Sequence, residues 1–264
     1  MSIAIANNFQ LAAKTNLTKL TFFSDWPQEY YDETFREVLP LAMTLQLRIY
    51  VPPHPLIKHW LGVARDEATP SVLFRSAMTE LGRWLTYEAI RDWLPTEDTI
   101  VQTPLAPCPA TTIDFTIPIA VVPILRAGLS MLEGAQTLLP LASIYHLGLV
   151  RDEETLTPSC YLNKLPAQFD PETRVLIPEP MLATGGSIMA AMTQLVSRGV
   201  DPAKVRVVSV VAAPPALKQL SLAYPSLIIY SAAIDEGLND RGFIVPGLGD
   251  AGDRTFGTWG ATFR

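Results

Sequence analysis

The chain has 264 residues, of which 48% are hydrophobic and 17% charged, with a formal net charge of −6. These values indicate a folded globular protein, and the acidic balance argues against nucleic-acid binding. No apolar run reaches the roughly 18 residues of a membrane span. The flanks of Cys108 and Cys160 lack metal-ligand spacing, so we expect free thiols in a reducing, cytoplasmic location.

Residues 1–24 show no strong pattern, and we expect residues 1–52 to form an N-terminal extension of a main domain at 53–264. A helix is expected before Pro40, because proline cannot continue a helix. A strand is expected at 45–51, where apolar residues alternate.

Two further segments precede the main sheet. Thr69 with Pro70 behind it marks a helix start, and an apolar face with helical spacing extends that helix to about Trp93. Residues 96–118 are rich in Thr and Pro. We therefore expect short strands and loops there, which form a small hood over the sheet edge.

Apolar runs then alternate with helical patterns over the rest of the chain. The expected strands are 119–125, 143–150, 174–178, 205–212 and 227–233. Continuous apolar runs are typical of strands buried on both faces, and their alternation with helices indicates a parallel sheet. The predicted fold class is therefore α/β, with an open, mostly parallel five-stranded sheet and helices on both faces.

The most informative stretch is 175–199. A short apolar strand is followed by Glu179, then by a Gly-rich turn at 183–187, and then by a helix that ends near Gly199. A Gly-rich turn at a helix N-terminus offers backbone N–H groups to an anion, and an acid beside it can hold sugar hydroxyls or a metal. These features predict a site for a phosphorylated sugar.

The residues of this turn exclude two other nucleotide-binding motifs. No Lys follows Gly186, which excludes a Walker phosphate loop, and the Gly-x-Gly-x-x-Gly dinucleotide fingerprint is absent. An ordinary strand-to-helix turn stays open on the pattern alone, because short Gly-rich turns are common.

Two arginines also follow expected strands. Arg126 precedes Ala127 and Gly128, and its guanidinium can pair with phosphate while glycine lets an amide approach. Arg151 opens a charged loop, for which a solvated surface is the alternative. Near the C-terminus, Gly247, Gly249 and Gly252 fall within six positions, which excludes a regular element there.

Four stretches resemble the uracil phosphoribosyltransferase family. They are EPMLATGGS from Glu179, VPILRAG from Val122, RDEETL from Arg151 and IVPGLGDAGDRTFGT from Ile244. The resemblance extends from about His54 to Thr258 and is greatest to the cyanobacterial and plastid branch. It implies a type I phosphoribosyltransferase fold and the synthesis of UMP and pyrophosphate from uracil and phosphoribosyl pyrophosphate (PRPP).

The resemblance also implies the site residues. Catalytic roles fall to Arg126, Arg151 and Asp250. The PRPP site comprises these three residues with Glu179, Pro180, Met181, Leu182, Ala183, Thr184, Gly185, Gly186 and Ser187. The uracil site comprises Ile244, Gly249, Asp250 and Ala251. The family usually has Asp where this chain has Glu179, and a methylene of difference moves a carboxylate by roughly 1 Å.

The resemblance implies partners as well. It implies Mg²⁺ bound together with PRPP, without residues assigned to a dedicated metal site. It further implies a GTP effector, a homodimer or homotetramer, and no nucleic-acid or membrane partner. Two rival functions stay open: a regulatory protein that binds these ligands with little turnover, and a phosphoribosyltransferase that acts on another base.

Overall fold

The computed structural model describes residues 47–151 and 158–258, and these residues belong to one compact unit. The side chain of Arg151, the loop after it and the helix expected before Pro40 lie outside the described residues.

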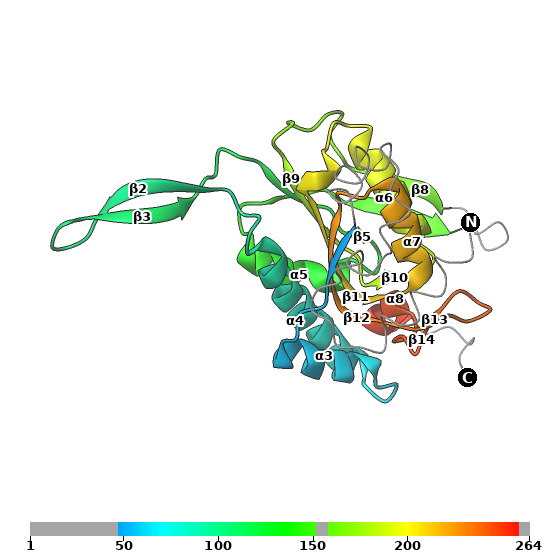
Figure 1. Cartoon of the computed structure of the whole chain (residues 1–264). Helices are drawn as coiled ribbons and strands as arrows, with labels where there is room; N and C mark the ends of the chain where they lie inside the picture. Colours follow the sequence, from blue (N-terminus) through cyan, green and yellow to red (C-terminus); the bar gives the residue numbers. More distant parts are fainter. Residues whose placement is uncertain (1–46, 152–157, 259–264) are drawn as a thin grey trace, which may run out of the picture. The chain divides into compact units, whose positions relative to one another are not determined.

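A parallel sheet forms the centre of this unit (Figure 1). Its strands are β1 (Arg48–Tyr50), β4 (Ile119–Val121), β6 (Ser143–Ile144), β9 (Arg174–Pro178), β10 (Met181–Leu182), β11 (Val205–Ala212) and β12 (Ile228–Ile234). The order is β1-β12-β11-β9-β4-β6, β10 pairs with β11, and each of these pairs is parallel. The α/β prediction is thus confirmed. All five expected strands contribute to the sheet, and β1 and the short β10 complete it.

Two of the expected strands are shorter in the main sheet than predicted. The run at 119–125 divides into β4 and β5 (Ile124–Leu125), and the run at 143–150 divides into β6 and β7 (Leu147–Arg151). β5 and β7 form a second sheet with β8 (Pro158–Asn163). Pro123 lies at the first division, where it has no N–H group to donate to a ladder. In this second sheet, β5 ends directly before Arg126 and β7 ends at Arg151.

Helices cover both faces of the main sheet, as predicted (Figure 1). They are α3 (Pro55–Arg65), α4 (Ser71–Ile90), α5 (Leu129–Leu138), α6 (Gly186–Val196), α7 (Pro214–Ala223), α8 (Ala251–Phe256) and the 3₁₀ helix η2 (Pro202–Lys204). Val208 and Val210 of β11 pack into a core cluster with α4, whereas Val205 and Val207 pack into a second cluster with α6. Alternate residues of a strand face opposite sides, so β11 is buried by both layers.

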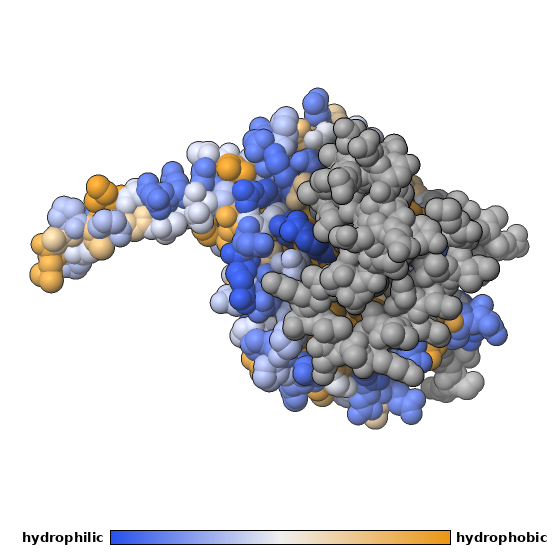
Figure 2. All heavy atoms as spheres, in the orientation of Figure 1, coloured by the Kyte–Doolittle hydropathy of each residue, from blue (hydrophilic) through white to orange (hydrophobic). Residues whose placement is uncertain are grey.

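The expected hood is instead an extended hairpin. β2 (Thr96–Gln102) and β3 (Pro107–Ile113) pair in antiparallel register and extend away from the sheet and helices (Figure 1). All residues of β2 are exposed. Figure 2 shows apolar side chains gathered at the hairpin tip, where Leu105 is 95% exposed. The local sequence predicted these strands. It could not show that they extend away from the sheet instead of packing over its edge.

Candidate active site

The predicted phosphate turn joins β9 to α6. Gly185 precedes α6 with φ +95°, a left-handed conformation that glycine adopts without penalty. A Cβ atom at Gly185 would lie 3.1 Å from Cα of Ala216 in α7. Thr184 and Gly186 are partly exposed and Ser187 is exposed. The first turn of α6 therefore presents amides and hydroxyls to an anion.

The residues just before this turn are bound to the neighbouring strand. The carbonyl oxygen of Pro180 accepts the N–H groups of Val210 and Val211 at 2.9 and 3.0 Å, and that of Leu182 accepts the Ala213 N–H at 2.8 Å. Pro180 and Leu182 are also buried. These residues hold the turn to β11, whereas Met181, Ala183 and Thr184 are partly exposed.

Glu179 is buried at the carboxyl end of β9. It is 7% exposed, and its N–H donates to the Val208 carbonyl at 3.0 Å. Burial raises the pKa of its carboxyl group to about 8, although the Met181 N–H favours the ionised form. The carboxyl group is therefore mostly protonated at neutral pH and can donate as well as accept a hydrogen bond.

The loop that carries Arg126 abuts the same end of β9. A Cβ atom at Gly128 would lie 2.5 Å from the carbonyl oxygen of Pro178, so only glycine fits there. The Gly128 N–H donates to the Ile124 carbonyl at 2.8 Å, which closes the loop. The Leu125–Arg126 peptide bond is cis. The structure thus places the Arg126 loop beside Glu179, as the carboxyl-end rule for parallel strands predicts.

The Arg126 side chain extends to the C-terminal Gly-rich segment. Nη2 of Arg126 donates to Oδ1 of Asp253 at 3.1 Å, and Nη1 donates to Oγ1 of Thr258 at 3.5 Å. Asp250 caps α8, because its Oδ1 accepts the Asp253 N–H at 2.9 Å. Arg126 and Asp250 therefore both contact Asp253 in the first turn of α8.

The predicted uracil residues form one short segment before and into α8. Ile244 lies in β14 (Ile244–Val245), which pairs with β13 (Gly237–Leu238), and its side chain is buried. Gly249 is exposed with φ +76°, and Ala251 is fully buried at the start of α8. The exposed backbone of this segment offers N–H and C=O groups to a flat ligand.

Arg151 is placed by its backbone alone. It ends β7, which pairs in parallel with β5, the strand that precedes Arg126. The carboxyl ends of neighbouring parallel strands meet at one sheet edge, so the backbones of both arginines leave the same edge.

Sequence reasoning missed four charged residues near this site. Arg65 and Asp235 bind each other and the Gly-rich segment, Asp253 binds Arg126, and Arg254 is buried beneath the segment. Asp235 directly follows β12, so the carboxyl-end rule that selected Glu179 could have found it. No local pattern marks Arg65, because its partner is 170 residues away.

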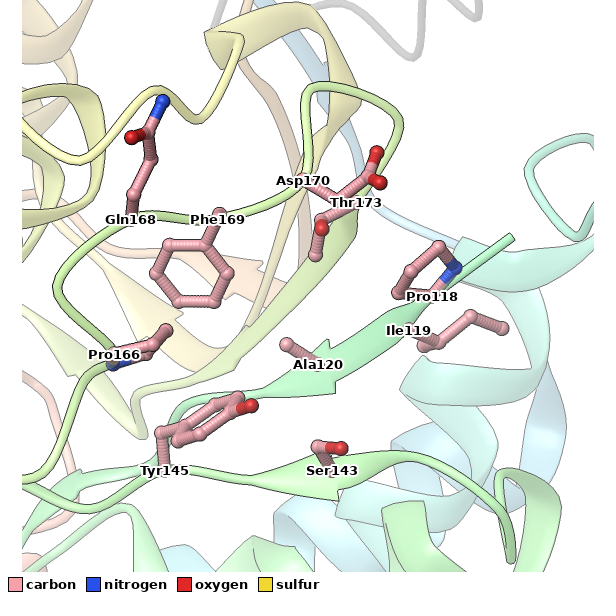
Figure 3. A pocket seen from close by; sticks show the side chains of 10 residues that line it. All are labelled: Pro118, Ile119, Ala120, Ser143, Tyr145, Pro166, Gln168, Phe169, Asp170 and Thr173. Carbon is pink, nitrogen blue, oxygen red and sulfur yellow. The ribbon is translucent and has the colours of Figure 1, made fainter. Parts of the chain in front are cut away.

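A cavity of about 210 Å³ lies at the opposite end of the sheet (Figure 3). It is lined by the starts of β4 and β6 and by the loop before β9, including Ile119, Ser143, Phe169 and Thr173. Ligands of open α/β sheets bind at the carboxyl ends of strands. The loops around Glu179 are therefore the candidate active site. Within residues 47–151 and 158–258, no helix is both long enough and apolar enough to cross a membrane.

A parallel sheet whose strands end in a Gly-rich turn, a buried carboxyl group and an arginine loop defines an open α/β protein with a candidate ligand site at the carboxyl ends of its strands. The family model for uracil phosphoribosyltransferase matches residues 51–258. The chain belongs to the uracil phosphoribosyltransferase family.

Individual relatives agree with this membership. The uracil phosphoribosyltransferase of Nostoc sp. is 77% identical over 216 residues, which cover 82% of this chain and all of the relative. A chloroplastic uracil phosphoribosyltransferase of Arabidopsis thaliana is 54% identical over 213 residues, which cover 81% and 72% of the two chains. The solved structure of the AQ2163 protein from Aquifex aeolicus matches with a TM-score of 0.72 and 39% identity, covering 79% of this chain and 97% of the other.

Proposed function

We propose that this chain transfers a phosphoribosyl group from PRPP to uracil, giving UMP and pyrophosphate. N1 of uracil forms a bond to the anomeric carbon as the bond from that carbon to pyrophosphate breaks. The transition state resembles an oxocarbenium ion, so catalysis depends on positioning and on stabilising charge rather than on a protein nucleophile.

Each loop of the site has a role in this reaction. Residues 184–187 bind the 5′-phosphate through helix N-terminal amides and hydroxyls. Glu179 bonds the ribose hydroxyls. Arg126 and Arg151 bind the pyrophosphate, where guanidinium groups match the phosphate oxygens. The backbone of Ile244 and residues 249–251 binds the donor and acceptor edge of uracil, and Asp250 links the two substrates.

Mg²⁺ fits this site as a partner of PRPP. Among the described residues, no group of three His, Cys, Asp or Glu side chains gathers to hold a metal ion. Mg²⁺ bound to substrate phosphates needs only one or two protein carboxylates. Asp250, which is partly exposed at the start of α8, would hold the ion directly or through water. The ion, when bound, neutralises charge on the pyrophosphate.

One observation carries the proposal: the Arg126 guanidinium bonds Asp253, three residues after Asp250, while its own loop abuts the end of β9. Phosphate turn, pyrophosphate loop and base segment thus share one edge. A regulatory protein could share these ligand sites, and its signature would be binding without turnover.

The direct test is UMP formation from labelled uracil, PRPP and Mg²⁺, with cytosine, hypoxanthine and orotate as control bases. We expect turnover on uracil alone. Turnover on another base would reassign the specificity. Binding of PRPP and uracil without turnover would support the regulatory alternative, and RNA binding with a steep salt dependence would establish it.

Family membership also supports proposals about assembly and location. We propose a homodimer or homotetramer, for which sedimentation would give two or four times 29.0 kDa. GTP is the proposed effector, to be tested as a change in turnover.

Cys108 and Cys160 are free and exposed, which supports a reducing, cytoplasmic location. Residues 1–52 are the proposed N-terminal extension. The family match begins at residue 51, while β1 already pairs with β12.

A further inference from the structure

An ion pair joins the end of α3 to the end of β12. Nη2 of Arg65 lies 2.6 Å from Oδ1 of Asp235, and Nη1 of Arg65 lies 3.0 Å from Oδ2. The Asp235 side chain is 5% exposed and that of Arg65 is 24% exposed. A two-pronged contact of this kind fixes the plane of both groups.

Both members of this pair also hold the main chain of Gly247. The Gly247 N–H donates to Oδ2 of Asp235 at 2.9 Å, and the Gly247 carbonyl accepts from Nη1 of Arg65 at 2.9 Å. Gly247 has φ +58°, and a Cβ atom there would lie 2.1 Å from the Ile244 carbonyl oxygen. The backbone is therefore folded tightly here and is held at both of its polar groups.

The carbonyl group of the next residue, Leu248, is bonded by a buried arginine. Arg254 of α8 is 2% exposed, and its Nη1 donates to the Leu248 carbonyl at 2.8 Å and to the Ala64 carbonyl. Ala64 and Arg65 are the last two residues of α3. The end of α3 therefore bonds Gly247 directly through Arg65 and is linked to Leu248 through Arg254.

Gly247 lies between Ile244 and Gly249, two of the residues proposed to bind uracil. We infer that Arg65 and Asp235 are positioning residues that set the backbone geometry of the uracil segment, an inference that rests on the proposed function. A base read by main-chain atoms depends on where that main chain lies, and a misplacement of about 1 Å can cost on the order of 10²-fold.

The test compares Asp235→Asn, Arg65→Met and Arg65→Lys with the unmodified enzyme. We expect Asp235→Asn and Arg65→Met to raise the KM for uracil by about 10- to 100-fold and to leave the KM for PRPP within about twofold. Arg65→Lys keeps the charge but loses the two-pronged contact, so its KM for uracil should fall between those of Arg65→Met and the unmodified enzyme.

Lys204→Met provides a matched control. Lys204 also bonds one carboxylate, that of Glu172, and one carbonyl, that of Pro171, both at 2.8 Å. Its side chain is 27% exposed, close to the 24% of Arg65, but its contacts lie near the start of β9. Loss of that ion pair should leave both KM values unchanged. Equal increases in both KM values for Asp235→Asn, or a uracil KM within twofold of the unmodified enzyme, would overturn the inference.

A second measurement is independent of turnover. Amide hydrogen exchange of residues 244–251 should accelerate at least about tenfold in Asp235→Asn, while exchange of residues 175–195 stays unchanged. Uniform acceleration of both segments would indicate general destabilisation and contradict a positioning role. If the unmodified chain formed no UMP, the proposed function would fail, whereas the exchange result would still decide whether the pair holds the segment.

Discussion

The protonation of Glu179 depends on the protein around it. Glu179 is 7% exposed, and burial raises the pKa of its carboxyl group to about 8 from an ordinary value of 4.5. A protonated carboxyl group can donate a hydrogen bond to a ribose oxygen, which an ionised group cannot do.

This pKa predicts a pH-dependent stability. Between pH 4.5 and about 8 the unfolded chain loses the Glu179 proton while the folded chain retains it, so the free energy of unfolding falls as pH rises. Relative to Glu179→Gln, the unmodified protein should lose on the order of a few kcal/mol across this range. Urea denaturation of both proteins at pH 5, 6, 7 and 8 measures the difference. A difference that does not change with pH would show that Glu179 is ionised when folded.

Two helices meet closely near the Arg126 loop. A Cβ atom at Gly82 of α4 would lie 2.4 Å from the Met131 carbonyl oxygen of α5. α5 begins at Leu129, directly after the loop that carries Arg126. The packing of α5 against α4 therefore fixes the position of the Arg126 loop as well as that of the core side chains between the two helices.

We expect Gly82→Ala to lower the free energy of unfolding by about 1–3 kcal/mol, because the added methyl group forces the helices apart. Gly62→Ala in α3 is the control, since a Cβ atom there has no neighbour within 4 Å. It should raise stability by about 0.5–1 kcal/mol through helix propensity. Denaturant midpoints measure both effects. Equal shifts of the denaturant midpoint in the two variants would show that helix propensity, not contact between the helices, decides the outcome at Gly82.

Across the whole molecule, two arginines bind the C-terminal segment in different ways. Arg126 is exposed, and its guanidinium group donates a hydrogen bond to the Asp253 carboxylate. Arg254 is buried, stacks over Phe74 with Cζ 4.2 Å from the ring centre, and bonds the Ala64 carbonyl 190 positions earlier in the chain. The Arg126 contact borders the proposed substrate site, and the Arg254 contact joins distant parts of the fold.

Substitution should separate these roles. Arg254→Met leaves several buried carbonyl oxygens without a donor and should lower the free energy of unfolding by about 2–5 kcal/mol. Arg126→Met removes an exposed ion pair and should change that free energy by less than about 1 kcal/mol. It should nevertheless lower kcat/KM for PRPP by about 10²- to 10³-fold. Thermal unfolding of both variants measures the stability change, and steady-state kinetics measure kcat/KM. A loss of stability in Arg126→Met would contradict its assignment to the site.

Local rules in the sequence selected several candidate site residues. Glu179, the turn at 183–187 and Arg126 each lie at the carboxyl end of an apolar run, and the structure brings their backbones to one edge. The same rule failed to show that Pro123 divides one strand between two sheets, because the pairing partner of each half is remote. It also failed to predict that residues 96–118 extend as a free hairpin, since strand propensity does not specify what a strand covers.

Periodicity, glycine placement and strand-end chemistry are encoded within a few residues, so the sequence by itself determined the α/β class, the position of the Gly-rich turn before α6 and the family. Contacts between distant residues are decided only by folding. The tertiary structure alone joined Arg65 to Asp235 across 170 positions and fixed Gly247 between them. It alone buried Glu179, because desolvation depends on all the elements packed around a group rather than on its neighbours in the chain.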